Sequence, residues 1–220
     1  MTVCTEELGL FGGRSASEAV VIANILAQPT GAYTAHDIGR IVSAYFRYCS
    51  AVMLDPVLVL AQVVHETGNF SSWWAARPRR NPAGIGVNGQ RVTAQPADTT
   101  GWAFDAEAKL WKKGCRFESW EDRSVPAHVG RLLAYLLPPK TGSAMQRAMI
   151  DLALTLHPLD PRVRGTVRVL RQLGQRHNPS GLGWAKPGTI YGRQIAAVAQ
   201  RLVALPPVAV AQRLAAQTPA

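Results

Sequence analysis

Glu66 is the residue of this sequence whose type and position best suit acid–base chemistry. It comes near the end of the run D-P-V-L-V-L-A-Q-V-V-H-E-T-G, where aliphatic side chains precede it. Apolar neighbours and the negative end of a helix dipole both disfavour the charged carboxylate. Both effects raise its pKa, as a general acid near neutral pH requires. His65 projects to another side of the helix and need not pair with it. The ordinary alternative is a solvated carboxylate, or one paired with an arginine.

The element that must position Glu66 is predicted to be a buried helix. Asp55 can accept hydrogen bonds from the first free amides, and Pro56 suits the first helical position, which needs no amide proton. The residues from 57 to 64 are apolar on almost every side, which is typical of a helix inside a core. Gly68 provides a natural end. The run is too short, and too closely bounded by charged residues, to cross a bilayer.

The rest of the chain predicts an α+β protein that is mainly α, with one principal domain. Apolar spacing and capping residues indicate further helices, with alternative starts at Ser15 or Ser17 and at Ser119 or Ser124. These predicted helices lie at about 17–26, 34–49, 106–113, 120–136, 143–156, 162–173 and 191–203. Residues 81–105 carry turn signals around short β-branched runs, which indicates a small irregular β-lobe. Residues 1–14 are expected to be loose. The predicted divisions are 1–32, 33–204 and an Ala/Pro-rich tail or linker at 205–220.

Charge and cysteine content narrow the possible partners. The net charge is +10, and residues 161–220 hold nine basic residues and no acidic one. Such a field favours an anionic partner, although a solvated basic face is the equally simple interpretation. Cys4, Cys49 and Cys115 are far apart, and no C-x-x-C pair occurs, so we expect neither a disulfide framework nor a structural zinc site. The sequence also has no phosphate-binding glycine loop and no dinucleotide fingerprint, and we expect no metal and no cofactor. The sequence shows no secretion signal and no membrane span.

Four blocks of sequence resemble, in the same order, the bacterial glucosaminidase family, glycoside hydrolase family 73. They are A-Q-V-V-H-E-T-G (61–68), N-P-A-G-I-G-V (81–87), F-E-S-W-E-D-R-S-V-P-A-H-V-G-R-L-L-A-Y (117–135) and G-W-A-K-P-G-T-I-Y-G-R-Q-I (183–195). The resemblance covers about residues 33–203. It implies a lysozyme-like helical domain with a small β-lobe. It also implies cleavage of the β-1,4 bond between N-acetylglucosamine and N-acetylmuramic acid in peptidoglycan.

The resemblance also implies roles for single residues. Glu66 becomes the general acid, and Tyr191 becomes the tyrosine that lines the cleft beside it. A phenol there can hydrogen-bond the acetamido group of the substrate or hold a water. The family's segment at the base of the β-lobe, where glycines let a sugar approach the backbone, matches Asn81, Gly84, Ile85 and Gly86. Aromatic residues that could stack on sugars are Trp73, Trp74 and Trp184, of which at least one is expected in the core.

The second catalytic group is not fixed by the sequence. Asp98, Asp105 and Glu107 lie on the predicted lobe, and Asp98 is the first choice from its distance along the chain. A carboxylate roughly 6.5–9.5 Å from Glu66 would indicate inversion, and one about 5–5.5 Å away would indicate retention. The substrate's own N-acetyl group could replace this carboxylate.

The sequence therefore predicts a peptidoglycan hydrolase, of the autolysin or endolysin kind, that acts on glycan strands and could bind anionic wall polymers. It would work outside the cell or at the wall, by an export route that the sequence does not reveal, or as a phage- or virion-borne protein. A muramidase or lytic transglycosylase on the same scaffold is one alternative. An inactive basic module that binds wall or nucleic acid is another. A zinc protease is disfavoured because Asn69 stands where H-E-x-x-H needs its second histidine. His128 is expected to be packed rather than catalytic.

Overall fold

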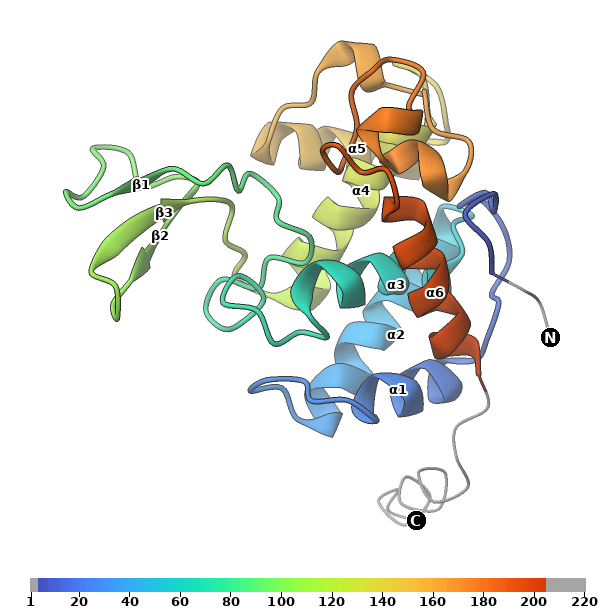
Figure 1. Cartoon of the computed structure of the whole chain (residues 1–220), viewed down its shortest axis with the longest axis horizontal. Coiled ribbons are helices and arrows are strands. Elements are labelled where there is room, and N and C mark those ends of the chain that lie inside the picture. Colours follow the sequence, from blue (N-terminus) through green and yellow to red (C-terminus); the bar gives the residue numbers. More distant parts are fainter. Residues whose placement is uncertain (1–3, 205–220) are drawn as a thin grey trace.

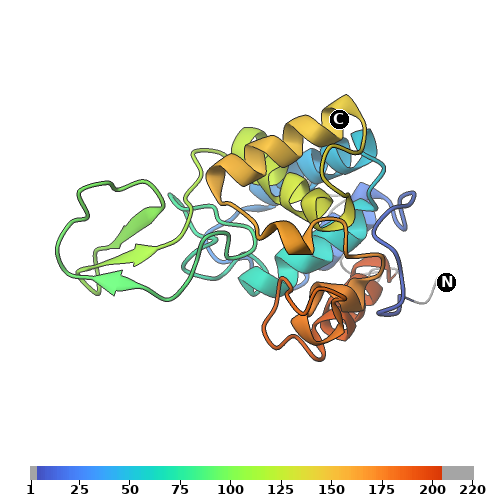
Figure 2. The ribbon, with the colours of Figure 1, turned by 90° about the horizontal axis from the view of Figure 1, so that it is seen from above.

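The computed structural model describes residues 4–204, which form a mainly helical body with a small sheet projecting from it (Figure 1). The prediction of a mainly α protein with a little β structure is confirmed. Helix α3 lies in the middle of the body, and the other helices surround it (Figures 1 and 2). The elements are α1 (Glu18–Leu26), α2 (Ala35–Ala51), α3 (Pro56–Thr67), β1 (Arg91–Val92), β2 (Trp102–Asp105), β3 (Leu110–Lys113), α4 (Val125–Leu136), α5 (Ala144–Leu156) and α6 (Tyr191–Val203).

Helix α3 is the buried helix that its sequence predicts. The Asp55 carboxylate accepts the Val57 amide proton at 2.9 Å, and Pro56 occupies the first turn. Gly68 ends the helix in the left-handed conformation, with φ of 56°, which costs a glycine little. All residues from 56 to 64 are buried, and α2 and α6 pack against the helix. The last turn of α3 is thus held by packing on several sides.

Side-chain caps also begin α1, α2 and α5 where the sequence indicates these helices. Ser17 caps α1, while Thr34 and Ser143 form capping boxes at α2 and α5. The segment after residue 117 combines the two alternatives. Ser119 caps a π-helical turn at Trp120–Ser124, and α4 follows it directly without a side-chain cap. Helix α6 begins at Tyr191, as predicted.

The predicted helix at 162–173 is wrong. The structure has only short 3₁₀ turns at Pro161–Val163 and Leu170–Leu173. Backbone amides that a helix would use internally are bonded elsewhere: the Gly165 and Val167 amides donate to α4 carbonyls, and the Leu170 amide donates to Leu8. The apolar residues of the predicted stripe are still buried. Their spacing therefore reports burial in the core, which for the Leu170–Leu173 turn includes packing on α6, rather than helical periodicity.

Two further expectations need correction for similar reasons. Residues 110–113 form strand β3, not the end of a helix, because they pair with β2 across a tight turn in which Lys109 has a positive φ. The part of segment 1–14 that the structure describes is only partly loose, because residues 11–14 are exposed whereas Cys4 and Leu10 are buried. Leu10 is buried, and its carbonyl accepts the Asp55 amide at 2.9 Å. This contact ties the N-terminal segment to the start of α3.

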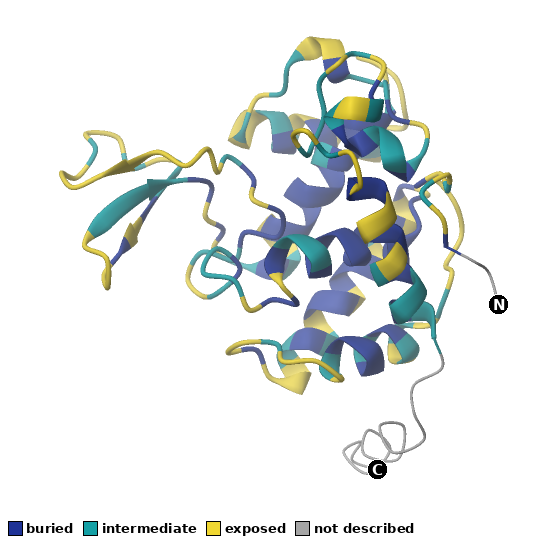
Figure 3. Cartoon of the chain, viewed as in Figure 1, coloured by how far each residue is buried: buried dark blue, intermediate teal, exposed yellow. Residues whose placement is uncertain are grey.

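The β-lobe is a three-stranded antiparallel sheet in the order β1-β3-β2. It projects away from the helices in both views (Figures 1 and 2) and is largely half-buried or exposed, whereas the inward faces of the helices are buried (Figure 3). The sequence of the predicted lobe has β-branched runs at 85–87 and 91–93. Residues Arg91–Val92 of the second run form a strand, whereas the first run lies in a turn. Trp73 joins the lobe to the body, since its ring lies under Arg79 (3.8 Å) and Lys112 of β3 (4.4 Å).

The predicted tail at 205–220 lies outside the described residues, and the domain boundaries stay predictions. Among the helices within residues 4–204, none has the length and apolar character needed to cross a membrane.

Gly130→Ala is expected to destabilise the fold at the contact between α4 and α5. A Cβ at Gly130 would lie 1.9 Å from the Met149 carbonyl oxygen, so the two helices would have to separate. Overpacking of this kind costs typically about 1–3 kcal/mol, and more where backbone must move. Urea unfolding measures the loss. The matched control is Gly39→Ala in α2, where a Cβ meets nothing within 4 Å and helix propensity favours alanine. Equal effects of the two substitutions would contradict the prediction.

Candidate functional site

The side chains of Glu66 and Tyr191 meet where α3 ends and α6 begins. Glu66 is half-buried in the last turn of α3, and Tyr191 is buried in the first turn of α6. The Tyr191 hydroxyl donates a hydrogen bond to the Glu66 carboxylate. Because α6 packs along α3, two residues 125 positions apart become direct partners.

Burial controls the protonation of both residues. It raises the pKa of the Glu66 carboxyl, and hydrogen bonding from Tyr191 and Trp184 opposes this rise without cancelling it. Burial also raises the pKa of Tyr191 well above its ordinary value, and the neighbouring Glu66 raises it further. Tyr191 is therefore a phenol that can donate, and Glu66 is an acid that keeps its proton to a higher pH than an exposed glutamate would.

Behind Tyr191, a row of hydrogen bonds runs through the core. The Gln62 amide nitrogen is 2.8 Å from the Tyr191 hydroxyl oxygen. The Gln62 carbonyl oxygen is 3.0 Å from Nε2 of His128, and Nδ1 of His128 is 3.1 Å from the Tyr45 hydroxyl. We call these residues, Tyr45, His128, Gln62, Tyr191 and Glu66, the buried row. It connects α2, α4, α3 and α6.

The sequence singled out only part of the buried row. Gln62 and Tyr45 were not expected at the site. One signal was present: Gln62 is a polar residue in an otherwise apolar helix, one turn before Glu66 and on the same side. His128 is packed, as predicted, and burial lowers its pKa to about 3, so its ring is neutral near pH 7. The His65 ring meets the Tyr191 ring edge-on at 5.5 Å.

Two of the three tryptophans predicted as possible sugar platforms, Trp184 and Trp74, lie in different surroundings. Trp184 is half-buried beside the buried row, 5.7 Å from the His128 ring and 5.6 Å from the Tyr135 ring. Trp74 packs edge-on against Trp73 at 4.8 Å, at the junction with the β-lobe. Both side chains keep some exposed surface. Of the two, only Trp184 affects the pKa of Glu66, which its hydrogen bonding lowers.

The predicted segment with Asn81 supports the β-lobe. Both ends of the Asn81 amide are used: it donates to the carbonyls of Ile85 (2.8 Å) and Cys115 (2.9 Å) and accepts the Ile85 amide proton (2.8 Å). Ile85 is buried in a small cluster with Cys115. Gly84 and Gly86 have positive φ, and a Cβ on Gly86 would lie 3.0 Å from the Cys115 sulfur. The glycines thus allow the tight turn that Asn81 closes.

The three candidate second carboxylates lie on the β-lobe. Asp98 is exposed on the loop between β1 and β2, and the backbone amide of Thr100 lowers its pKa. Asp105 pairs with Lys112 at 2.5 Å, which lowers its pKa, and Glu107 is exposed. Within residues 4–204, none of these three carboxylates is hydrogen-bonded to Glu66. Over the same part of the chain, no cluster of His, Cys, Asp and Glu could hold a metal ion.

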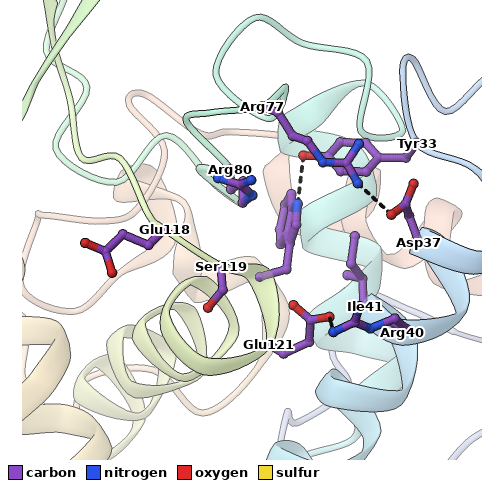
Figure 4. A pocket seen from close by; sticks show the side chains of 10 residues that line it. Tyr33, Asp37, Arg40, Ile41, Arg77, Arg80, Glu118, Ser119 and Glu121 are labelled. Atoms are coloured by element: carbon purple, nitrogen blue, oxygen red, sulfur yellow. Dashed lines mark hydrogen bonds and ion pairs between the residues drawn. The ribbon is translucent and has the colours of Figure 1, made fainter.

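A hollow of about 180 Å³ lies between α2 and the turn before α4 (Figure 4). Its charged side chains are bonded mostly to one another: Arg77 pairs with Asp37 at 2.5 Å, and Arg40 pairs with Glu121 at 2.7 Å. The Trp120 indole donates to the Tyr33 hydroxyl at 2.8 Å. This hollow contains no member of the buried row.

Comparisons of the chain with models of known protein families, with curated proteins and with solved structures find no match. The class of site therefore has to be argued from its own geometry. A half-buried carboxylic acid of raised pKa, held by a phenol and beside an indole, suits a proton donor.

Proposed function

We propose that this protein is a peptidoglycan hydrolase with a lysozyme-like fold, an endo-β-N-acetylglucosaminidase in which Glu66 is the general acid. The observation that carries the proposal is the contact between Glu66 and Tyr191. The four sequence blocks that suggest the activity make these two residues neighbours, and their side chains are hydrogen-bonded. The small β-lobe beside a helical body also fits the proposed architecture.

In the proposed reaction, the protonated Glu66 carboxyl donates its proton to the glycosidic oxygen as the bond from that oxygen to the anomeric carbon breaks. A water then adds to the anomeric carbon of N-acetylglucosamine and gives up a proton to the Glu66 carboxylate, which restores the acid for the next turnover. The Tyr191 hydroxyl stabilises the Glu66 carboxylate that forms, because hydrogen bonds to ionised groups are stronger than those between neutral groups. The Trp184 ring offers an apolar face to a sugar.

For the second group, we favour the substrate's acetamido group over Asp98. The three lobe carboxylates are either exposed or, for Asp105, ion-paired with Lys112. Asp98→Asn is accordingly expected to keep wall cleavage within about threefold of wild type, since a lost catalytic carboxylate would cost about 10²-fold or more. Initial rates of reducing-end release measure this, with the exposed Glu107→Gln as the control. A loss of about 10²-fold for Asp98→Asn alone would make Asp98 the second catalytic group.

The test of the activity is digestion of purified cell walls with analysis of the products. We expect loss of turbidity and new reducing ends at N-acetylglucosamine, identified by borohydride reduction and mass spectrometry. Reducing ends at N-acetylmuramic acid would make the protein a muramidase, and anhydro ends would make it a lytic transglycosylase. Wall binding without any bond cleavage would contradict the enzymatic proposal.

Binding of anionic wall polymers through the basic C-terminal third is a further part of the proposal. Part of that charge is neutralised within the fold, because Arg162, Arg171 and Arg193 pair with Asp160, Glu7 and Glu6. We therefore expect weak attraction that salt suppresses, since exposed charges are screened within about 8 Å at physiological ionic strength. Co-sedimentation with walls across a salt series measures it.

A further inference from the structure

We propose that Gln62 and His128 are positioning residues, which hold the hydroxyl of Tyr191 in the direction of Glu66 through the buried row. This inference rests on the proposed function for its catalytic meaning. Its geometry does not depend on the reaction, because it follows from four consecutive hydrogen bonds between side chains of α2, α4, α3 and α6.

The direction of every hydrogen bond in the buried row follows from its ionised end. An ionised Glu66 carboxylate can only accept, so the single hydroxyl proton of Tyr191 points to it. The Tyr191 oxygen then accepts from the Gln62 amide nitrogen, which turns the Gln62 carbonyl toward His128. That carbonyl needs a donor, and His128 Nε2–H supplies it. A neutral ring has one N–H, so Nδ1 accepts, and Tyr45 donates to it.

Burial makes this order costly to break. Tyr45, Gln62, His128 and Tyr191 are all buried, so water does not replace a lost partner. Turning the Gln62 amide over would set a carbonyl against the Tyr191 oxygen and an N–H against His128. An unpaired buried polar group costs more than the net gain of one hydrogen bond, so the row behaves as a unit.

The row matters most when Glu66 has given up its proton. Each donor points toward Glu66, so the row stabilises the carboxylate formed as the glycosidic oxygen is protonated. Burial acts in the opposite sense, because it raises the pKa of Glu66 and so favours the protonated acid. Other titratable groups near the row are Tyr135, His65, Arg131 and Cys49, and these stay unchanged in the variants below.

The direct test is the titration of the Glu66 carboxyl carbon by NMR, with Glu66→Gln used to assign the signal. Gln62→Met, which has a similar shape but no donor, is expected to move this titration to higher pH. Tyr191→Phe is expected to move it at least as far. In the Tyr191→Phe background, Gln62→Met should add almost nothing, because its effect passes through the missing hydroxyl. A merely structural role for Gln62 would leave the titration of Glu66 in place.

His128 is tested by a matched pair. His128→Gln can still offer an N–H to Gln62, and we expect its Glu66 titration to lie close to wild type, whereas His128→Leu should shift it upward as Gln62→Met does. Tyr33→Phe is the control, because it also removes a buried hydroxyl bonded to other groups, but outside the row. Should His128→Leu fail to fold, Gln62→Met still decides.

Wall cleavage separates the inference from the proposed function. We expect Gln62→Met to lower kcat by about tenfold with little change in KM, as removal of one supporting hydrogen bond would. Shifted titrations in a protein that cleaves no wall would support the row and end the proposed function. If the wild type cleaves wall but Gln62→Met leaves the titration of Glu66 unshifted, the positioning role of the row is wrong and the proposed function still stands.

Discussion

Glu66→Gln is expected to lower the rate of wall cleavage by about 10²–10⁴-fold, the range that general acid catalysis contributes. The amide has the shape of the acid and can still accept the Tyr191 hydrogen bond, but it has no proton to give. Within residues 4–204, no other carboxyl group is hydrogen-bonded to the buried row, so no second carboxylic acid is placed to take over the donation. Initial rates of reducing-end release from purified walls measure the loss.

The matched control for this variant is Glu118→Gln, which changes an exposed glutamate outside the buried row. It should leave the rate within about twofold of wild type, as surface substitutions commonly do. Thermal unfolding of both variants checks that the fold is retained. If Glu66→Gln kept more than a tenth of the wild-type rate, Glu66 would not be the acid.

Acid is expected to destabilise the protein through His128, by as much as about 5 kcal/mol between pH 6.5 and pH 3. Burial lowers the pKa of His128 from 6.5 to about 3 in the folded protein. Between those values the unfolded chain binds a proton that the folded chain does not. The contribution of His128 to the free energy of unfolding is therefore complete above pH 6.5, and it is lost as the pH falls from 6.5 to about 3. Glu66, whose pKa is raised, contributes in the opposite sense.

Urea unfolding at pH 7 and pH 4.5 tests this prediction. Wild type should lose roughly 3 kcal/mol more than His128→Gln over this interval, since two pH units correspond to about that free energy. His36→Gln, at an exposed histidine of α2, should behave like wild type. The same pH dependence in wild type and His128→Gln would show that His128 is not the group responsible.

Local signals in the sequence were sufficient to predict a helix where capping residues in the same segment mark its start and its end. Helix α3 has Asp55, Pro56 and Gly68 in the positions that each favours, and Ser17 and Thr34 mark two further starts. The prediction failed where distant partners decide. Residues 162–173 have a helical apolar pattern, but their amides bond to α4 and to Leu8, so no continuous helix forms.

The candidate site was predictable only in part. The burial of Glu66 follows from its own helix. That Tyr191 lies beside it was predicted only from the resemblance to the glucosaminidase family, since no local rule pairs residues so far apart. Gln62 and Tyr45 could not be placed, because their roles depend on how α2, α3 and α4 pack around His128. Such a row is a property of the packed core rather than of any one segment.

The anchoring of the β-lobe has a consequence for its movement. The chain enters and leaves the lobe through two adjacent segments, and the Asn81 side chain is bonded to both, at Ile85 and at Cys115. The side-chain amide of Asn81 therefore holds together the two segments that connect the lobe to the helices, which we call the neck of the lobe. If the lobe closed over a bound glycan, the chain would have to bend between the neck and the strands, beyond the Asn81 hydrogen bonds. The neck itself would stay rigid with the helices.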